Sequence, residues 1–222
     1  MKSYIKELEN AFNEQANAEI AKAQSAYLKN LFPLIGLKTP VRREIQKPFL
    51  VKANLPSKSE AEAIATILWA KPEREYHYFA QELLQKYNKQ LEVRDIELFE
   101  FMATHNSWWD TVDMIAAKLM GTYFKQYPEE IEVKVDKWLA SDNIWLQRCA
   151  ILFQLKYKTD TDTILLARLI NSLLGSKEFF INKAIGWILR EYGKTNPEWV
   201  LEFVEKTDLE PLSRREAVRL LI

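Results

Sequence analysis

The sequence predicts an all-α protein, an α-solenoid built from antiparallel pairs of helices. Only five of its 222 residues are glycine, which is few for a sheet protein with many tight turns. No segment alternates apolar and polar residues with the period of a strand, whereas helix-capping residues and prolines recur at short intervals. No linker rich in Gly, Pro and Ser divides the chain. We therefore expect one domain, residues 1–222.

Capping residues and prolines indicate where the helices begin. Residues 1–8 form an amphipathic pattern, and Thr39 places a hydroxyl just before Pro40, the first helical position. Ser107 and Asp110 have the spacing of a capping box. Apolar residues recur at helical spacing after each such signal. We expect helices near residues 3–15, 18–32, 40–53, 58–70, 72–89, 93–104, 108–125, 129–140, 143–157, 161–173, 176–193, 197–206 and 213–221.

Two helices end in similar sequences, which indicates a repeat. The segment 154–157 reads Gln-Leu-Lys-Tyr, and the segment 189–192, which lies 35 residues further on (192 − 157), reads Leu-Arg-Glu-Tyr. Another helix ends similarly at Lys86-Tyr87. A period of roughly 35–40 residues is close to the lower edge of HEAT-like repeats. The self-similarity is weak, so other α-helical bundles stay open at this point.

Charge and composition limit the classes of function. Lys and Arg balance Asp and Glu at 31 each, which argues against a generic nucleic-acid coat. Residues 1–53 carry nine basic against five acidic side chains, residues 54–142 ten against sixteen, and residues 143–222 twelve against ten. This order permits a cationic concave face if the chain curls. The lone Cys149 and the lack of an apolar run of about 18 residues predict a soluble, cytoplasmic protein.

The helix expected at 108–125 carries two kinds of residue. The residues that we expect to be buried form a stripe along one face of the helix, with the spacing i, i+4, i+7, i+11, i+12. Trp109 and Asp113 lie off that stripe and four residues apart, so they share one flank of the helix. In the simpler interpretation Trp109 packs on a neighbouring helix and Asp113 faces solvent. The stripe consists of Trp108, Val112, Ile115, Leu119 and Met120.

Equal steps along the chain connect this flank to two later helices. Arg148 follows Trp109 by 39 residues (148 − 109), and Trp187 follows Arg148 by 39 residues (187 − 148). If repeats place equivalent edges on one surface, these three side chains converge with Asp113. Tryptophan faces can press against deoxyribose or bases, arginine can hold phosphate, and a carboxylate can stabilise a developing cation. Two isolated histidines and one cysteine offer no metal-ligand spacing, and no glycine-rich phosphate loop is present.

Several strings closely resemble the AlkD family of DNA alkylation repair enzymes, and the resemblance covers essentially the whole chain. The matching strings are Asn106-Ser107-Trp108-Trp109-Asp110-Thr111-Val112-Asp113, Ser141-Asp142-Asn143-Ile144-Trp145-Leu146-Gln147-Arg148, Ser176-Lys177-Glu178-Phe179-Phe180, Lys183-Ala184-Ile185-Gly186-Trp187, Arg190-Glu191-Tyr192 and Pro211-Leu212-Ser213-Arg214-Arg215-Glu216-Ala217.

The resemblance implies a curved solenoid of HEAT-like repeats whose concave face grips double-stranded DNA. It implies a DNA glycosylase of base excision repair that releases cationic N3- or N7-alkylated purines such as 3-methyladenine and 7-methylguanine. Asp113 matches the catalytic carboxylate, while Trp109 and Trp187 match residues that cradle the sugar and backbone of the lesion. Arg148 matches a phosphate or active-site contact. Such enzymes do not draw the base into a protein pocket, unlike most enzymes that act on bases.

The resemblance also implies DNA-binding residues. Relatives that lack the N-terminal helix entering the minor groove are poor glycosylases, and residues 17–32 retain that helix here. Lys38 stands where the family is expected to carry glutamine. We expect a monomer that needs no cofactor and no metal. The expected DNA-binding residues are Tyr27, Lys38, Thr39, Arg43, Lys156, Arg190 and Arg214.

A cationic base leaves without protonation, so the chemistry implied here needs no general acid and no lysine nucleophile. We therefore expect a monofunctional enzyme that leaves an abasic site. Two alternatives stay open. One is a non-catalytic DNA-binding protein of the same fold, and the other is a HEAT-type scaffold for protein interactions, which the zero net charge favours.

Overall fold

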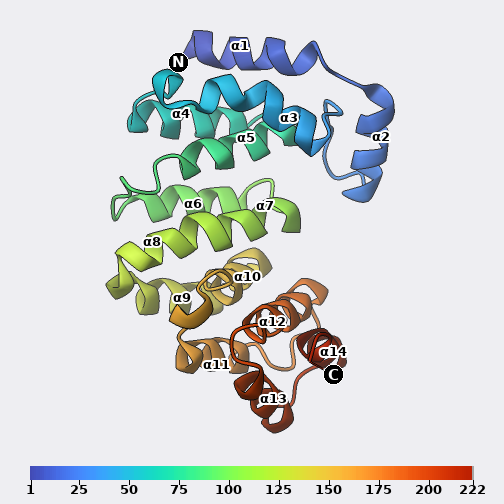
Figure 1. Ribbon diagram of the computed structural model, residues 1–222, viewed down its shortest axis with the longest axis vertical. Helices are drawn as coiled ribbons and strands as arrows, with labels where there is room; N and C mark the ends of the chain where they lie inside the picture. The colour runs from blue at the N-terminus through green and yellow to red at the C-terminus, as the bar shows by residue number, and fades with distance from the viewer. Residues whose placement is uncertain (222) are drawn as a thin grey trace. The chain divides into compact units, whose positions relative to one another are not determined.

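The computed structural model describes residues 1–221, and within that range every regular element is a helix (Figure 1). The all-α prediction is confirmed. Ile222, the last residue of the expected domain, lies outside the described residues. The chain divides into two compact units, Met1–Gln90 and Leu91–Ile222. The expectation of one domain over residues 1–222 stays a prediction.

The first unit begins with three helices and ends with a packed pair. Its last two helices, α4 and α5, lie side by side. Ser57 starts α4 through a capping box with Glu60, which satisfies two backbone amides at the helix N-terminus. Phe12 stacks on Tyr76 and meets Phe79 edge to face, which ties α1 to α5. The helices are α1 (Lys2–Asn13), α2 (Ala18–Tyr27), α3 (Thr39–Gln46), α4 (Lys58–Trp69) and α5 (Arg74–Gln85), with short 3-10 turns at Lys47–Leu50 and Lys52–Asn54.

A buried carboxylate fixes the segment that connects α2 to α3. Glu75 is fully buried, and its oxygens accept hydrogen bonds from the backbone amides of Ile35, Gly36 and Leu37 at 2.9–3.1 Å. Gly36 has a φ of +93°, and a Cβ there would lie 2.0 Å from the carbonyl oxygen of Asn17. Only glycine fits this close approach. The chain between α2 and α3 is therefore anchored to α5.

The second unit consists of helices that pack on their neighbours in the chain and on the next helices but one. Contacts join α9 to α10, α10 to α12 and α12 to α14. Asn143 and Asp162 cap α10 and α11 with their side chains. The helices are α6 (Asp95–Thr104), α7 (Trp109–Met114), α8 (Gly121–Gln126), α9 (Ile131–Leu139), α10 (Ile144–Leu152), α11 (Thr163–Asn171), α12 (Phe179–Tyr192), α13 (Pro197–Lys206) and α14 (Pro211–Val218).

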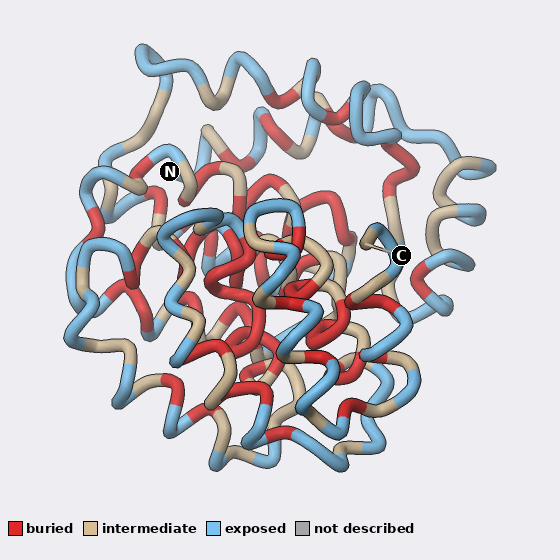
Figure 2. The backbone as a smooth tube through the Cα atoms, turned by 60° about the horizontal axis from the view of Figure 1, so that its bottom comes forward, coloured by how far each residue is buried: buried red, intermediate tan, exposed pale blue. Residues whose placement is uncertain are grey.

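The helix expected at 108–125 is continuous, but its middle turn is wider than an α-helix. Residues Ile115–Met120 form a π-helical segment between α7 and α8. The segment packs on α6 and α10. The core positions Val112, Ile115, Leu119 and Met120 are buried as expected, whereas Trp108 is half-buried. Buried and exposed stretches alternate along the backbone in Figure 2, as amphipathic helices require.

Three of the helix starts that differ from the expected ones involve a capping residue or a proline. Trp108 is the N-cap of α7, and Ser107 instead donates to the carbonyl of Ala103, so the expected capping box does not form. Lys38 rather than Thr39 is the N-cap of α3. The last helix begins at Pro211, two residues before the expected start, because proline suits the first helical position. Among residues 1–221, no helix combines the length and apolar character that crossing a membrane requires.

Candidate functional site

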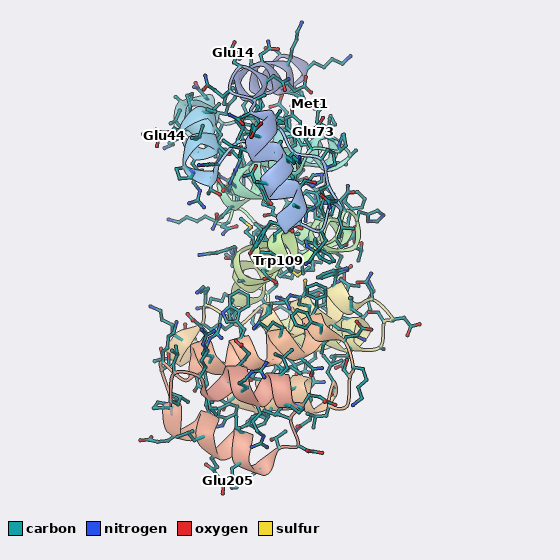
Figure 3. All side chains as sticks on the ribbon, turned by 90° about the vertical axis from the view of Figure 1, so that its right-hand side faces the viewer. Met1, Glu14, Glu44, Glu73, Trp109 and Glu205 are labelled. Carbon is teal, nitrogen blue, oxygen red and sulfur yellow. The ribbon has the colours of Figure 1, made fainter. Side chains whose placement is uncertain are left out.

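A cavity of about 300 Å³ opens in the second unit over one face of α12. Five of its lining residues lie on that helix, and four of these follow one another with spacings of four, four and three residues, which places them on one face. Two more come from α7 and one from α10. The lining residues are Trp109, Asp113, Arg148, Phe179, Phe180, Lys183, Trp187 and Arg190. Figure 3 labels Trp109, which begins α7.

Asp113 and Arg148 form a bidentate ion pair in the lining of the cavity. Nε of Arg148 donates to Oδ1 of Asp113 at 2.7 Å, and Nη2 donates to Oδ2 at 3.0 Å. Nη1 of Arg148 donates to the backbone carbonyl of Phe180. The arginine side chain is 4% exposed and the aspartate side chain 16% exposed. Arg148 therefore joins α7, α10 and the start of α12, and the fork geometry fixes both carboxylate oxygens.

The surroundings of Asp113 act on its pKa in two directions. Burial raises the pKa of Asp113 above its ordinary value, because desolvation disfavours the charged form, while hydrogen bonds and charge from Arg148 oppose the rise. A carboxylate that is desolvated yet bound by a guanidinium remains available to interact with positive charge nearby. Burial likewise raises the pKa of the Cys149 thiol, which is fully buried. Cys149 is therefore a packing residue and not an accessible thiolate.

An aromatic cluster supports the carboxylate–arginine pair. The ring of Trp108 lies 4.9 Å from that of Phe180 and 5.6 Å from that of Trp145. Trp145 and Phe180 are 5.0 Å apart. The adjacent Trp109 is half-buried and lines the cavity. The two tryptophans thus have different surroundings, as the off-stripe position of Trp109 indicated.

The structure brings five of the expected site residues into this cavity. Trp109, Asp113, Arg148 and Trp187 are the four expected at the reaction centre, and Arg190 was expected to bind DNA. Their roles stay predictions. The simpler interpretation of Asp113 as a solvated surface residue is wrong, because its side chain is 16% exposed and paired with Arg148.

The remaining expected DNA-binding residues lie at several places on the two units. In the first unit, Tyr27 is 69% exposed at the end of α2, and Lys38 and Thr39 are exposed at the start of α3. Arg43 lies on α3, with its Nε 3.5 Å from a carboxylate oxygen of Glu82. In the second unit, Nζ of Lys156 is 3.2 Å from a Glu191 oxygen, and Arg214 donates to the carbonyl of Thr207. Their contact with DNA stays a prediction.

Sequence reasoning did not select Phe179, Phe180 or Lys183 as site residues. Phe179 is 57% exposed, and the Lys183 side chain is 38% exposed. Phe179 and Lys183 precede Trp187 by eight and four residues, so helical spacing alone could have placed them on its face. Phe180 belongs to the site because its carbonyl accepts a hydrogen bond from Arg148. Residue spacing does not predict this contact.

The fold and the cavity define an all-helical protein with an arginine-held carboxylate beside two tryptophans. The chain belongs to the DNA alkylation repair enzyme family, whose model matches residues 8–221. A solved structure described as a predicted DNA alkylation repair enzyme from Enterococcus faecalis is 33% identical, with a TM-score of 0.86. That similarity covers 93% of this chain and 97% of the other. No curated protein matches the chain. The family expected from the sequence is thus confirmed, and with it a role in repair of alkylation damage.

Proposed function

We propose that this protein is a monofunctional DNA glycosylase that hydrolyses the N-glycosidic bond of cationic N3- and N7-alkylated purines in duplex DNA. The observation that carries the proposal is the position of Asp113, a desolvated carboxylate that both lines the cavity and is held by Arg148. Trp109 and Trp187 line the same cavity. Membership in the DNA alkylation repair family supports the same chemistry at a coarser level.

The proposed reaction breaks the bond between C1′ of the deoxyribose and the purine nitrogen. The bonding electrons leave with the base and neutralise its positive charge, so the base needs no proton. Positive charge then develops on the sugar, where the largely buried Asp113 carboxylate stabilises it electrostatically. Water adds its oxygen to C1′ and loses a proton to solvent or to Asp113. The products are a free alkylated purine and an abasic site.

The aromatic and cationic residues of the cavity have distinct proposed roles. Trp109 and Trp187 present flat apolar faces to the deoxyribose and hold it against Asp113. Arg148 fixes the orientation of the carboxylate through its two hydrogen bonds. Lys183 lies in the cavity, yet its Nζ is 2.8 Å from Glu216. An ion-paired ammonium is not a nucleophile, so we do not expect a lysine Schiff base with the sugar.

We propose that duplex DNA is bound through both units by a monomer that acts as one domain in the cytoplasm. Tyr27, Lys38, Thr39 and Arg43 would contact DNA from the first unit. Lys156, Arg190 and Arg214 would do so from the second. Lysine and arginine side chains bind phosphate without reading sequence, which suits an enzyme that must find damage anywhere.

Release of free base tests the proposal directly. Purified protein is incubated with duplex DNA carrying 7-methylguanine, 3-methyladenine or hypoxanthine, and the released bases are separated by chromatography. We expect release of both bases, no release of the neutral base hypoxanthine, and no protein–DNA adduct after borohydride reduction. The spontaneous loss from the same DNA without protein is subtracted. DNA binding without any base release would instead indicate the non-catalytic alternative.

A further inference from the structure

A buried carboxylate on α14 lies against the two cations on the cavity face of α12. Glu216 is 7% exposed. Its Oε1 is 2.8 Å from Nζ of Lys183, and its Oε2 accepts a hydrogen bond from Nη1 of Arg190. Both cations line the cavity that contains Asp113. Lys183 and Arg190 are seven residues apart, about two turns of helix, so one carboxylate bridges two turns of α12.

Close packing of α14 on α12 makes this bridge possible. Gly186 lies between the two cations on α12, and a Cβ there would be 2.5 Å from Cβ of Glu216 and 2.9 Å from the carbonyl oxygen of Ser213. A side chain at this position would move α14 away. The Ser213 hydroxyl also donates to the carbonyl of Asn182 at 2.9 Å, which fastens α14 to α12. The position of Glu216 is therefore built into the helix packing.

The charges around the cavity do not cancel. Asp113 and Arg148 neutralise each other, whereas Lys183, Arg190 and Glu216 together leave one positive charge. An ammonium has three N–H donors and a guanidinium five, while Glu216 has two oxygens. The two cations therefore keep donors for a further anion at the cavity. A phosphodiester carries one negative charge and two unbridged oxygens, and it suits this arrangement.

The pKa of Glu216 lies below its ordinary range. The hydrogen bond from Lys183 is the main cause, and the bond from Arg190 acts in the same direction, while burial opposes both. Glu216 is therefore ionised at neutral pH and holds both cations in place.

We infer that Glu216 is a positioning residue, which holds Lys183 and Arg190 at the cavity so that they bind the phosphodiester group next to the alkylated nucleotide. The inference rests on the proposed function, because it takes duplex DNA as the substrate. Glu216 acts through the two cations and touches no reacting atom. Without it, Lys183 and Arg190 would sample many rotamers, so fewer of the complexes with DNA would hold the alkylated nucleotide in the reactive position.

Glu216→Gln tests the inference, because glutamine keeps the volume of the side chain and removes its charge. Three quantities are measured for each variant: the melting temperature, the Kd for undamaged duplex DNA at several salt concentrations, and the single-turnover rate of 7-methylguanine release. Glu202→Gln is the matched control. It removes the same charge from an ion pair with Lys206 on α13, which does not line the cavity.

We expect Glu216→Gln to lower the release rate roughly tenfold to a hundredfold, as a loss of positioning does. Its affinity for undamaged duplex should be unchanged or tighter, because the protein gains one unit of positive charge. Glu202→Gln should release base at the wild-type rate. An unchanged release rate in Glu216→Gln would overturn the inference. A rate that falls only in proportion to the folded fraction would show a structural role instead.

A double-mutant cycle on DNA affinity separates this inference from the proposed reaction. In the wild-type background, Lys183→Gln should weaken duplex binding severalfold. It should also lower the slope of log affinity against log salt concentration by about one. The same substitution should have much less effect on affinity when it is made in the Glu216→Gln variant. Equal effects in both backgrounds would overturn the inference, as would a wild-type protein that binds no duplex. A wild type that binds duplex without releasing base contradicts only the proposed reaction. If Glu216→Gln does not fold, an unchanged affinity and salt slope in Lys183→Gln alone overturns the inference.

Discussion

Both carboxylate oxygens of Asp113 are held by the single guanidinium of Arg148, at 2.7 Å from Nε and 3.0 Å from Nη2. The remaining terminal nitrogen of Arg148 binds the carbonyl of Phe180. The residues are 35 positions apart in the chain (148 − 113) and lie on different helices. The orientation of the carboxylate is therefore set by tertiary packing.

Asp113→Asn should slow base release far more than it weakens DNA binding. Asparagine keeps the shape but not the charge that stabilises the developing cation, a loss of about 2.7–4 kcal/mol, or roughly a hundredfold to a thousandfold in rate. The single-turnover rate of 7-methylguanine release and the Kd for duplex DNA are compared with those of wild type. Asp160→Asn, which removes a carboxylate from an exposed pair with Lys125, is the control. Equal rates for Asp113→Asn and wild type would exclude Asp113 as the catalytic carboxylate.

The pH profile should show that release requires Asp113 in its ionised form. Burial raises the pKa of this carboxyl from its ordinary value of 3.8, so protonation begins at a higher pH than for an exposed aspartate. The rate should fall as the pH decreases through the raised pKa. Single-turnover rates are measured across the acidic range and corrected for spontaneous base loss, with melting curves to show that the protein stays folded. A rate that increases on acidification would contradict this assignment.

The sequence predicts the local parts of this site better than its tertiary parts. Trp109 and Asp113 are four residues apart, and that spacing was enough to separate them from the buried stripe that contains Val112. Arg148 was selected from the equal steps of 39 residues that connect it to Trp109 and Trp187, together with the family resemblance. The bridge by Glu216 could not be predicted, because it depends on how closely α14 approaches α12 at Gly186, a distance that no residue spacing encodes.

For the fold too, features set by the local sequence were predicted, and features set by tertiary packing were not. Apolar periodicity and capping residues predicted most of the helices, because both act within one or two turns. The π-helical segment Ile115–Met120 was not predicted, since it is set by packing on α6 and α10. The predicted N-cap at Ser107 does not form, because the Ser107 hydroxyl donates to the carbonyl of Ala103 in the preceding helix. A serine hydroxyl can accept a hydrogen bond from a backbone amide of the following helix or donate one to a carbonyl of the preceding helix. The local sequence does not decide between these two partners.

Arg148→Lys should shift the pH profile upward and lower the rate at neutral pH. Lysine keeps the charge but cannot form the two parallel hydrogen bonds to Asp113. With fewer hydrogen bonds to its charged form, the desolvated carboxyl should have a still higher pKa than in wild type. Rates are measured over the same pH range as for wild type. If the profile keeps its wild-type midpoint, the hydrogen bonds from Arg148 do not control the ionisation of Asp113.

Glu75→Gln should destabilise the first unit without removing any residue of the cavity. The amide nitrogen of glutamine cannot accept a hydrogen bond, so at least one of the buried backbone amides at residues 35–37 loses its partner. Each such loss costs about 1–3 kcal/mol. The free energy of unfolding is measured by urea denaturation, with Glu44→Gln as an exposed control expected within about 0.5 kcal/mol of wild type. A stability equal to that of the control would mean that Glu75 does not anchor the segment before α3.

Trp109→Ala and Trp187→Ala should lower activity more than stability. Both side chains are half-buried in the cavity lining, so truncation removes a surface for the sugar and leaves most of the core in place. Trp138 is a fully buried tryptophan of the same unit, and Trp138→Ala provides the reference for loss of a core residue, about 3–5 kcal/mol. The cavity variants should lose much less than that reference, while their release rates fall about a hundredfold because the sugar is no longer pressed against Asp113. Each variant is melted, and its single-turnover release of 7-methylguanine is expressed per folded molecule. If either cavity variant is as unstable as Trp138→Ala and releases base normally per folded molecule, that tryptophan is a packing residue and the lesion binds elsewhere.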